Sequence, residues 1–481
     1  MQRKLATQLA ALILISSAPF ISTSAAATGL LEIYQLAIEN DPQYRGAEAA
    51  YYAALETKSQ SRAQLLPLVN LSANTSKNKQ DTISSGFFAL GTRRFASSGY
   101  TLSLSQPLFN YDYFIQLRQS DATIGEAKAN LSAAQQALMV RISERYFDAL
   151  AALDGLEFAR AEKRAIDRQL EQTRQRFEVG LIAITDVHEA QAAYDLVTAQ
   201  EILAENLLAS QYEALAEITG RYHKTLAVLS AETPLITPEP ADIGKWGDTA
   251  LNQNFQLIAA EFVYNKARDE IKRQRAGHLP TLELNASHTY ADSKGGNFGN
   301  NESENQAIEL RLNMPLFQGG STSSRTRQAQ RLADQSREGF ERQRRATLRQ
   351  ARDAYLSVLA EINRVKALGQ AVVSAQSALD ATEAGLEVGT RTTVDVLDTR
   401  RELFRAQRDH ARSRYDYILH TLRLKQAAGI LATADLELIN GWLQSRNAPA
   451  KHSSAEHSSA EKHSVATTAK PSLADTAIGI E

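Results

Sequence analysis

The sequence predicts a mainly α-helical fold with a small β part, made of two copies of a long-helix unit that each carry one β-hairpin. Three observations support this fold class: an internal duplication, proline-free helical segments of unusual length, and short stretches in which apolar and polar residues alternate. Helical and strand periodicities occupy separate stretches of the chain, so each can be assigned to its own element.

Four pairs of matching segments reveal the duplication. In each pair, the second segment follows the first by roughly 210 residues. The pairs are residues 66–73 with 279–286, 106–109 with 314–317, 177–180 with 386–389, and 185–187 with 394–396. Solenoid repeats run to roughly 50 residues, so each copy here must be a whole supersecondary assembly.

The N-terminus has the pattern of a secretory signal. Arg3 and Lys4 precede the apolar run 5–15, and small residues follow at 24–27. This pattern predicts cleavage between residues 25 and 28 and therefore an exported protein. The run is too short for a spanning helix, which needs about 20 residues.

The domain boundaries follow from the duplication and from changes in composition. Three prolines mark the segment between the copies, and a polar, histidine- and serine-rich stretch follows the second copy. The expected divisions are a signal peptide (1–27), a first repeat (28–221), an equatorial insertion (222–247), a second repeat (248–443) and a disordered polar tail (444–481).

The helices are the longest expected elements. Residues 113–177 and 322–386 contain no proline, so each can form a rod of about 100 Å. Helices of this length indicate a coiled coil. Four shorter helices, expected at about 31–64, 185–220, 249–277 and 393–429, complete parallel rods in pairs.

Each copy also contains one hairpin, expected at about 66–110 and 279–318 with loops at 86–94 and 295–300. Tyr100, Leu102 and Leu104 alternate with polar residues, as expected for strands with one apolar face. Strands of about ten residues fit a membrane barrel, although alternation alone fits a soluble sandwich equally well.

The hairpins require association if they form a barrel. Small barrels begin at about eight strands, and an open four-stranded sheet leaves its edges unpaired. Two, three or four copies would supply 8, 12 or 16 strands, and these patterns do not choose between them.

The chain has no cysteine, so it has neither disulfides nor a cysteine lipid anchor. Its net charge of −2 argues against a nucleic-acid partner. It also lacks the phosphate-, dinucleotide- and zinc-binding motifs, so the sequence offers no motif for a cofactor or a metal site.

Residues 168–187, 277–282 and 389–398 closely resemble the TolC family of outer-membrane efflux and secretion channels, and the likeness runs from about Leu31 to Leu443. The resemblance implies a homotrimer with a 12-stranded barrel in outer-membrane lipid and a helical barrel that crosses the periplasm. It also implies a non-catalytic exit duct for drug efflux and type I protein secretion. A periplasmic adaptor and an inner-membrane ABC, RND or MFS-type transporter would open its periplasmic end.

The candidate functional residues lie just after the turns between long and short helices. Asp395 and Asp398 share one helix face, and the resemblance assigns them to the periplasmic constriction. Helix capping is the alternative, because Thr392 and Asp395 have capping-box spacing.

The resemblance also assigns the polar links of the closed gate to Arg391, Thr185 and Asp186. The family commonly has an aromatic hydroxyl where this chain has Leu386, which makes Arg391 more important for the gate.

Two other functions remain open at this stage. One is an outer-membrane component dedicated to a single pump, for example for metal cations. The other is a structural coiled-coil protein anchored by a barrel, which would need no constriction. The paired carboxylates favour a gated duct over that structural role.

Overall fold

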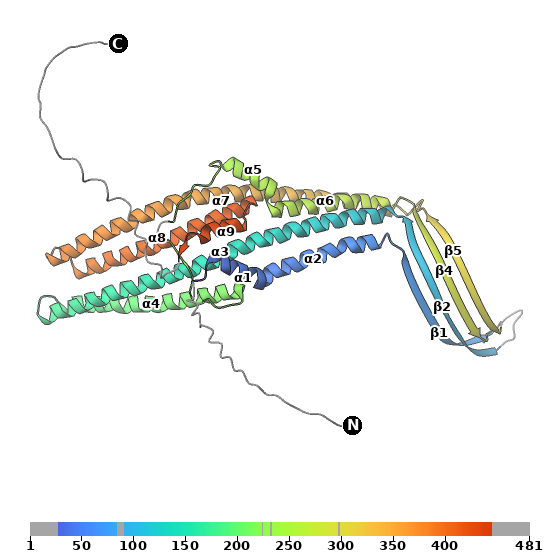
Figure 1. Ribbon diagram of the computed structural model, residues 1–481, viewed down its shortest axis with the longest axis horizontal. Coiled ribbons are helices and arrows are strands. Elements are labelled where there is room, and N and C mark those ends of the chain that lie inside the picture. Colours follow the sequence, from blue (N-terminus) through green and yellow to red (C-terminus); the bar gives the residue numbers. More distant parts are fainter. Residues whose placement is uncertain (1–26, 84–90, 224, 231–232, 297–298, 445–481) are drawn as a thin grey trace, which may run out of the picture.

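The computed structural model describes residues 27–83, 91–223, 225–230, 233–296 and 299–444. The expected signal peptide up to residue 26 and the expected tail from residue 445 lie outside these residues. The described chain is an elongated molecule with a four-stranded sheet at one end and long helices that run away from it (Figure 1).

Two helices dominate the molecule. They are α3 (Tyr111–Glu178) with 68 residues and α7 (Ser321–Glu387) with 67 residues. At 1.5 Å per residue each is roughly 100 Å long. The predicted rods at 113–177 and 322–386 are therefore confirmed to within two residues at each end. The helix α3 begins where the Asn110 side chain accepts a hydrogen bond from the Asp112 amide at 3.1 Å.

Shorter helices lie along each long one. The helices α2 (Pro42–Ala63) and α4 (Ile184–Thr219) follow opposite halves of α3 (Figure 1). The helices α6 (Phe255–Ala276) and α8 (Thr393–Ala428) follow α7 in the same way. Two short helices thus match one long helix in both copies, as the sequence predicts.

The prediction of one helix over 31–64 is wrong. The chain forms α1 (Leu30–Asn40) and then α2, with a break at Asp41. The proline at position 42 disfavours a helical conformation of Asp41, whose backbone is extended at φ −67° and ψ 115°. The Asp41 carboxylate caps α2 by accepting the Gln43 amide at 3.0 Å.

The single helix expected over 249–277 is also two helices. They are α5 (Ile243–Gln253) and α6, separated by Asn254 in an extended conformation. The Asn254 side chain accepts the Leu257 amide at 3.1 Å and so starts α6.

The sheet is antiparallel in the order β1-β2-β4-β5, with strands β1 (Leu68–Thr82), β2 (Gly91–Phe109), β4 (Thr281–Lys294) and β5 (Asn300–Asn313). Both predicted hairpins are present. The strands have 14 to 19 residues, so the expectation of about ten is wrong. Residues 91–94 and 300, expected in loops, belong to β2 and β5, and residues 84–90 lie outside the described part.

The two faces of the sheet differ in polarity near the helices. One row across the four strands consists of Val69, Leu104, Ala286 and Ile308. A row of the opposite face consists of Ser72, Thr101, Thr289 and Asn305. Alternation therefore gives the sheet one apolar and one polar face.

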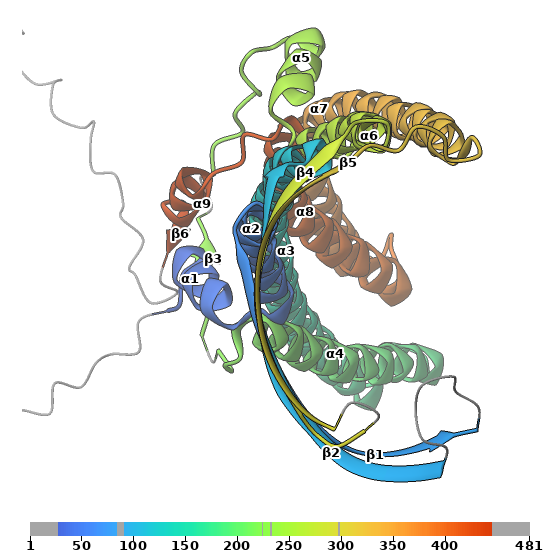
Figure 2. The same cartoon turned by 90° about the vertical axis from the view of Figure 1, so that its right-hand side faces the viewer.

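The largest hydrophobic cluster lies midway along the helices, where α1, α3 and α8 meet α9 (Thr433–Asn440). The strands β3 (Val228–Leu229) and β6 (Leu443–Gln444) pair beside it. In Figure 2, α1, α9, β3 and β6 lie outside the curved helical layer, on its convex side. Among the helices that the structure describes, none combines the length and the apolarity that crossing a membrane requires.

Candidate gate at the helix tips

Helices α3 and α4 form one coiled coil, and α7 and α8 form a second. The candidate gate residues lie at the ends of these two coiled coils, far from the sheet (Figure 1). Both turns contain a glycine in the left-handed conformation, Gly180 at φ 75° and Gly389 at φ 77°. Each amide bonds back to its helix, with Gly180 donating to the Phe177 carbonyl at 2.9 Å and Gly389 to the Leu386 carbonyl at 3.2 Å. The duplicated glycines are thus explained by two turns of the same geometry.

Asp395 caps α8. Its carboxylate accepts the Thr392 backbone amide at 2.8 Å and the Thr392 hydroxyl at 3.0 Å, and its own amide donates to that hydroxyl oxygen at 3.2 Å. These hydrogen bonds from Thr392, helped by the charge of Arg391, hold the pKa of Asp395 below its usual range. Asp395 is therefore both a cap and a carboxylate that stays ionised.

Asp398 lies one turn further along α8 and is exposed. Its carboxylate accepts Arg401 Nη1 at 2.9 Å, an ion pair between residues three apart on the helix surface. Such exposed pairs contribute little to stability. The structure thus places both aspartates in the first turns of α8, each with a different partner on its own helix.

The structure places the three expected link residues at the tips of two different coiled coils. Thr185 and Asp186 lie in the first turn of α4, and Arg391 precedes α8 and is exposed. Arg391 donates its amide to the Gly385 carbonyl at 3.2 Å. Neither a hydrogen bond nor an ion pair joins its guanidinium to Thr185 or Asp186 inside the described chain.

Leu386, the departure noted in the sequence, has a packing role. Its half-buried side chain packs against a small cluster of Leu379, Val396 and Leu403 between α7 and α8. An apolar residue at this position thus tightens the second coiled coil near its tip.

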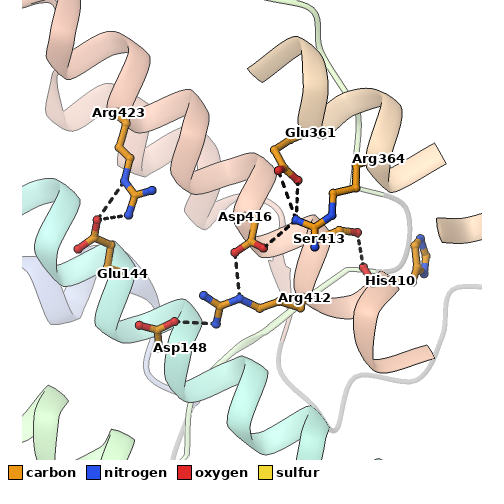
Figure 3. Close-up of polar contacts among 9 residues, drawn as sticks. All are labelled: Glu144, Asp148, Glu361, Arg364, His410, Arg412, Ser413, Asp416 and Arg423. Atoms are coloured by element: carbon orange, nitrogen blue, oxygen red, sulfur yellow. Dashed lines mark hydrogen bonds and ion pairs between the residues drawn. The ribbon is translucent and has the colours of Figure 1, made fainter. Parts of the chain in front are cut away.

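Sequence reasoning missed a set of ion pairs between α3 and α8 (Figure 3). Arg412 contacts Asp148 of α3 at 2.7 Å and Asp416 of its own helix at 2.9 Å. Arg423 contacts Glu144 at 2.7 Å, and the Tyr415 hydroxyl donates to Asp154 at 2.7 Å. These contacts join the first repeat to the second. The only signal in the sequence is the density of arginines in α8, which does not identify their partners.

Glu162 of α3 extends this contact towards the tips. Its side chain is 1% exposed, and neither carboxylate oxygen has a hydrogen-bond partner among the residues that the structure describes. The nearest cation is Arg408 of α8, whose Nη1 lies 3.8 Å away. Burial raises the pKa of Glu162, and the charges of Arg408 and Arg401 oppose that rise.

Within the described residues, no group of three or more His, Asp or Glu side chains is arranged to hold a metal ion. The tip residues offer charge, hydrogen bonding and packing.

Comparison with known proteins gives consistent matches across both halves. The family model "Outer membrane efflux protein" matches residues 33–221 and 246–430. The outer membrane protein TolC of Vibrio cholerae is 40% identical over 88% of this chain and 96% of its own length. TolC of Escherichia coli is 35% identical over 88% of this chain and 86% of its own length. The alkaline protease secretion protein AprF of Pseudomonas aeruginosa is 34% identical over 88% of this chain and 89% of its own length.

Among solved structures, the Campylobacter jejuni CmeC outer membrane channel matches with a TM-score of 0.72 at 15% identity, over 92% of this chain and 98% of that one. This likeness supports the fold: a mainly helical chain with two β-hairpins.

Proposed function

Because the chain belongs to the outer membrane efflux protein family, and is therefore a transport channel rather than an enzyme, we propose that three copies form one duct across the outer membrane and the periplasm. The sheets of three copies would form a 12-stranded barrel, and the helices would extend it into the periplasm. The unpaired outer edges of β1 and β5 support this assembly, since a lone four-stranded sheet leaves both edges exposed.

The partners that we propose are a periplasmic adaptor and an inner-membrane ABC, RND or MFS-type transporter. Relatives named for protease secretion, AprF and PrtF, are 34% and 30% identical to this chain. A relative named as an efflux protein, BepC, is 22% identical. These names, which speak of efflux and of protease secretion, support our proposal of one duct for drug efflux and type I protein secretion.

We further propose that Asp395 and Asp398 form the constriction at the periplasmic end. In a threefold assembly they would make two rings of three carboxylates. The hydrogen bonds from Thr392 support this role because they keep Asp395 ionised. The cap and the constriction are compatible, since one carboxylate oxygen bonds Thr392 and the other remains available.

Arg391 would hold the closed gate by reaching Thr185 and Asp186 of a neighbouring copy. Within the described chain, neither a hydrogen bond nor an ion pair joins Arg391 to Thr185 or Asp186, which favours a link between copies. Leu386 packs into its own coiled coil, so Arg391 carries more of the link than in relatives with an aromatic hydroxyl there.

The proposal is tested by the mass and the conductance of the mature protein in detergent. We expect a trimer that inserts into planar bilayers as a channel, and a monodisperse monomer would refute the assembly. In-cell cross-linking followed by mass spectrometry should then recover an adaptor and an inner-membrane transporter linked to α3, α4, α7 or α8. Links to neither class of protein would contradict the role as an exit duct.

A further inference from the structure

The outer strands of the sheet each have one edge without a partner in the described chain. Strand β1 pairs with β2 alone, and β5 pairs with β4 alone. All neighbouring pairs are antiparallel, so β1 and β5 run in opposite directions. The β5 edge of one copy can therefore continue the antiparallel sheet by pairing with β1 of a second copy.

The apolar face of the sheet shows how such a pair would be aligned. On β1 this face stays apolar through Ala73 and becomes polar at Thr75. On β5 it is already polar at Gln306, which stands in the same row as Leu71. The boundary between apolar and polar side chains thus shifts by about four residues across the three strand pairs.

This shift is the slant expected of strands that tilt in a closed barrel. If the boundary between apolar and polar side chains lies at one height around the closed barrel, the boundary on β5 must line up with the boundary on β1 of the neighbouring copy. Thr75 of the neighbouring copy then lies beside Ile308 or Gln306. Residues further along that β1 strand, Lys77 and Lys79, come next to Glu304 and Glu302.

We propose that β5 of one copy pairs with β1 of the next in a register shifted by about four to six residues, so that Glu302 and Glu304 form ion pairs with Lys77 and Lys79. This inference rests on the trimeric duct proposed above. A shift of six places Glu304 opposite Lys79, and a shift of four places Glu304 opposite Lys77 and Glu302 opposite Lys79. We name this contact between copies the charged seam.

The charges on the two edges are complementary and available. All four side chains are exposed and project from the same face of the sheet. Among the described residues, no ion pair involves Lys77 or Lys79. Glu302 accepts the Tyr290 hydroxyl at 2.7 Å. Glu304 accepts the Gln306 amide at 3.1 Å and lies 3.8 Å from His288 Nδ1. Within the part of the chain that the structure describes, neither carboxylate forms an ion pair with a lysine or an arginine. Opposite charges on facing strands stabilise the pairing.

An unshifted register fits the same edges poorly. It would place Glu304 opposite Ala73, Gln306 opposite Leu71 and Lys77 opposite Asn300, because these residues share rows within the chain. The glutamates would then interrupt the apolar rows of the neighbouring copy, and the lysines would face no carboxylate. A closed barrel also requires a stagger in register.

Cysteine cross-linking tests the register, and the absence of any native cysteine makes the result unambiguous. We compare full-length chains that carry Glu304→Cys together with Lys79→Cys, Lys77→Cys or Ala73→Cys. The shifted register predicts that the Lys79 or the Lys77 variant forms disulfide-linked trimers under oxidising conditions. The Ala73 variant, which reports the unshifted register, should not. Cross-linking of the Ala73 variant, or of none of the three, overturns the proposal.

Charge reversal tests the ion pairs. Lys77→Glu with Lys79→Glu should lower the temperature at which the trimer dissociates in detergent, and so should Glu302→Lys with Glu304→Lys. Combining all four changes should restore most of the loss, because the pairs are re-formed with exchanged signs. Additive losses would show that the seam has no such pairs.

The control for charge reversal is Lys58→Glu on helix α2, a partly exposed lysine that pairs with Asp121 at 2.7 Å and lies outside the sheet. Reversal of Glu302 and Glu304 should not rescue that variant. A mature protein that is monomeric in detergent refutes the proposed duct itself. A stable trimer without cross-links or rescue refutes only the charged seam.

Discussion

At the scale of single residues, the tip of α8 combines two roles in one carboxylate. Asp395 starts the helix through Thr392, and the same hydrogen bonds favour its ionised form. The capping and constriction interpretations of the sequence are therefore not exclusive. The charge that a narrow entrance would use is maintained by the local helix geometry.

We predict that Asp395→Asn with Asp398→Asn abolishes the cation preference of the channel and weakens block by a trivalent cation by about tenfold or more, since carboxylate rings concentrate multivalent cations. Asparagine can still accept the Thr392 amide, so the cap survives. Planar-bilayer recording with the cation added from the periplasmic side measures both effects. Glu387→Gln at the end of α7 is the control, and equal block of all variants would show that the aspartates only cap α8.

We also predict that Glu162→Met stabilises the assembly by about 1 kcal/mol at neutral pH. Apolar replacement of buried ions gains about 1–4 kcal/mol, and the partly exposed Arg408 places this site at the low end. A raised pKa in the folded state means that Glu162 destabilises the fold where it is ionised. Its contribution is favourable only below the usual pKa of glutamate, about 4.3.

The advantage of the methionine variant should therefore shrink as the pH falls through the raised pKa of Glu162, and should reach its minimum below about 4.3. Thermal unfolding in detergent at neutral pH and at a pH below about 4 measures this difference. The exposed Glu171→Met on the same helix, whose carboxylate accepts Gln175 at 3.1 Å, should show no such gain. A loss of stability at neutral pH would mean that the pair with Arg408 outweighs the burial.

At the scale of elements, the two coiled coils are connected unevenly. Ion pairs and the Tyr415 hydrogen bond join α3 to α8 near the middle of the molecule. Towards the tips, the polar contacts are Glu162 with Arg408 and an Arg400 guanidinium that donates to the Ala165 carbonyl at 3.2 Å. Leu397 of α8 also packs with Ile166 of α3 and with Ala193 and Val197 of α4. Opening of the entrance would therefore bend the coils beyond this cluster rather than separate them along their whole length.

We predict that Arg391→Ser raises single-channel conductance. It removes the charge-assisted link that we propose between copies, and such a contact contributes about 1.5–3 kcal/mol. Arg405→Ser is the matched control, because Arg405 pairs at 3.2 Å with Glu402 of its own helix, away from the tip. An unchanged conductance for the Arg391 variant would indicate that helix packing alone keeps the entrance closed.

At the scale of the whole molecule, the duplication made most of the architecture predictable. The long helices end at Gly180 and Gly389, whose left-handed turns are visible in the sequence as matched motifs. The outer halves of the strands were not predictable, because residues 75–82 are polar on both faces and show no alternation. The contacts between α3 and α8 were also missed, since residues more than 250 positions apart meet only through the folded topology.

The isolated chain exposes an apolar sheet face and two unpaired strand edges, and this has a consequence for biogenesis. Ile308 is 83% exposed and Leu71 is 70% exposed. Such surfaces aggregate readily in water. In the proposed trimer, the last step of folding is then a meeting of chains, whose rate depends on their concentration. The proposed assembly therefore requires either rapid encounter of the copies or a chaperone that shields the sheet until they meet.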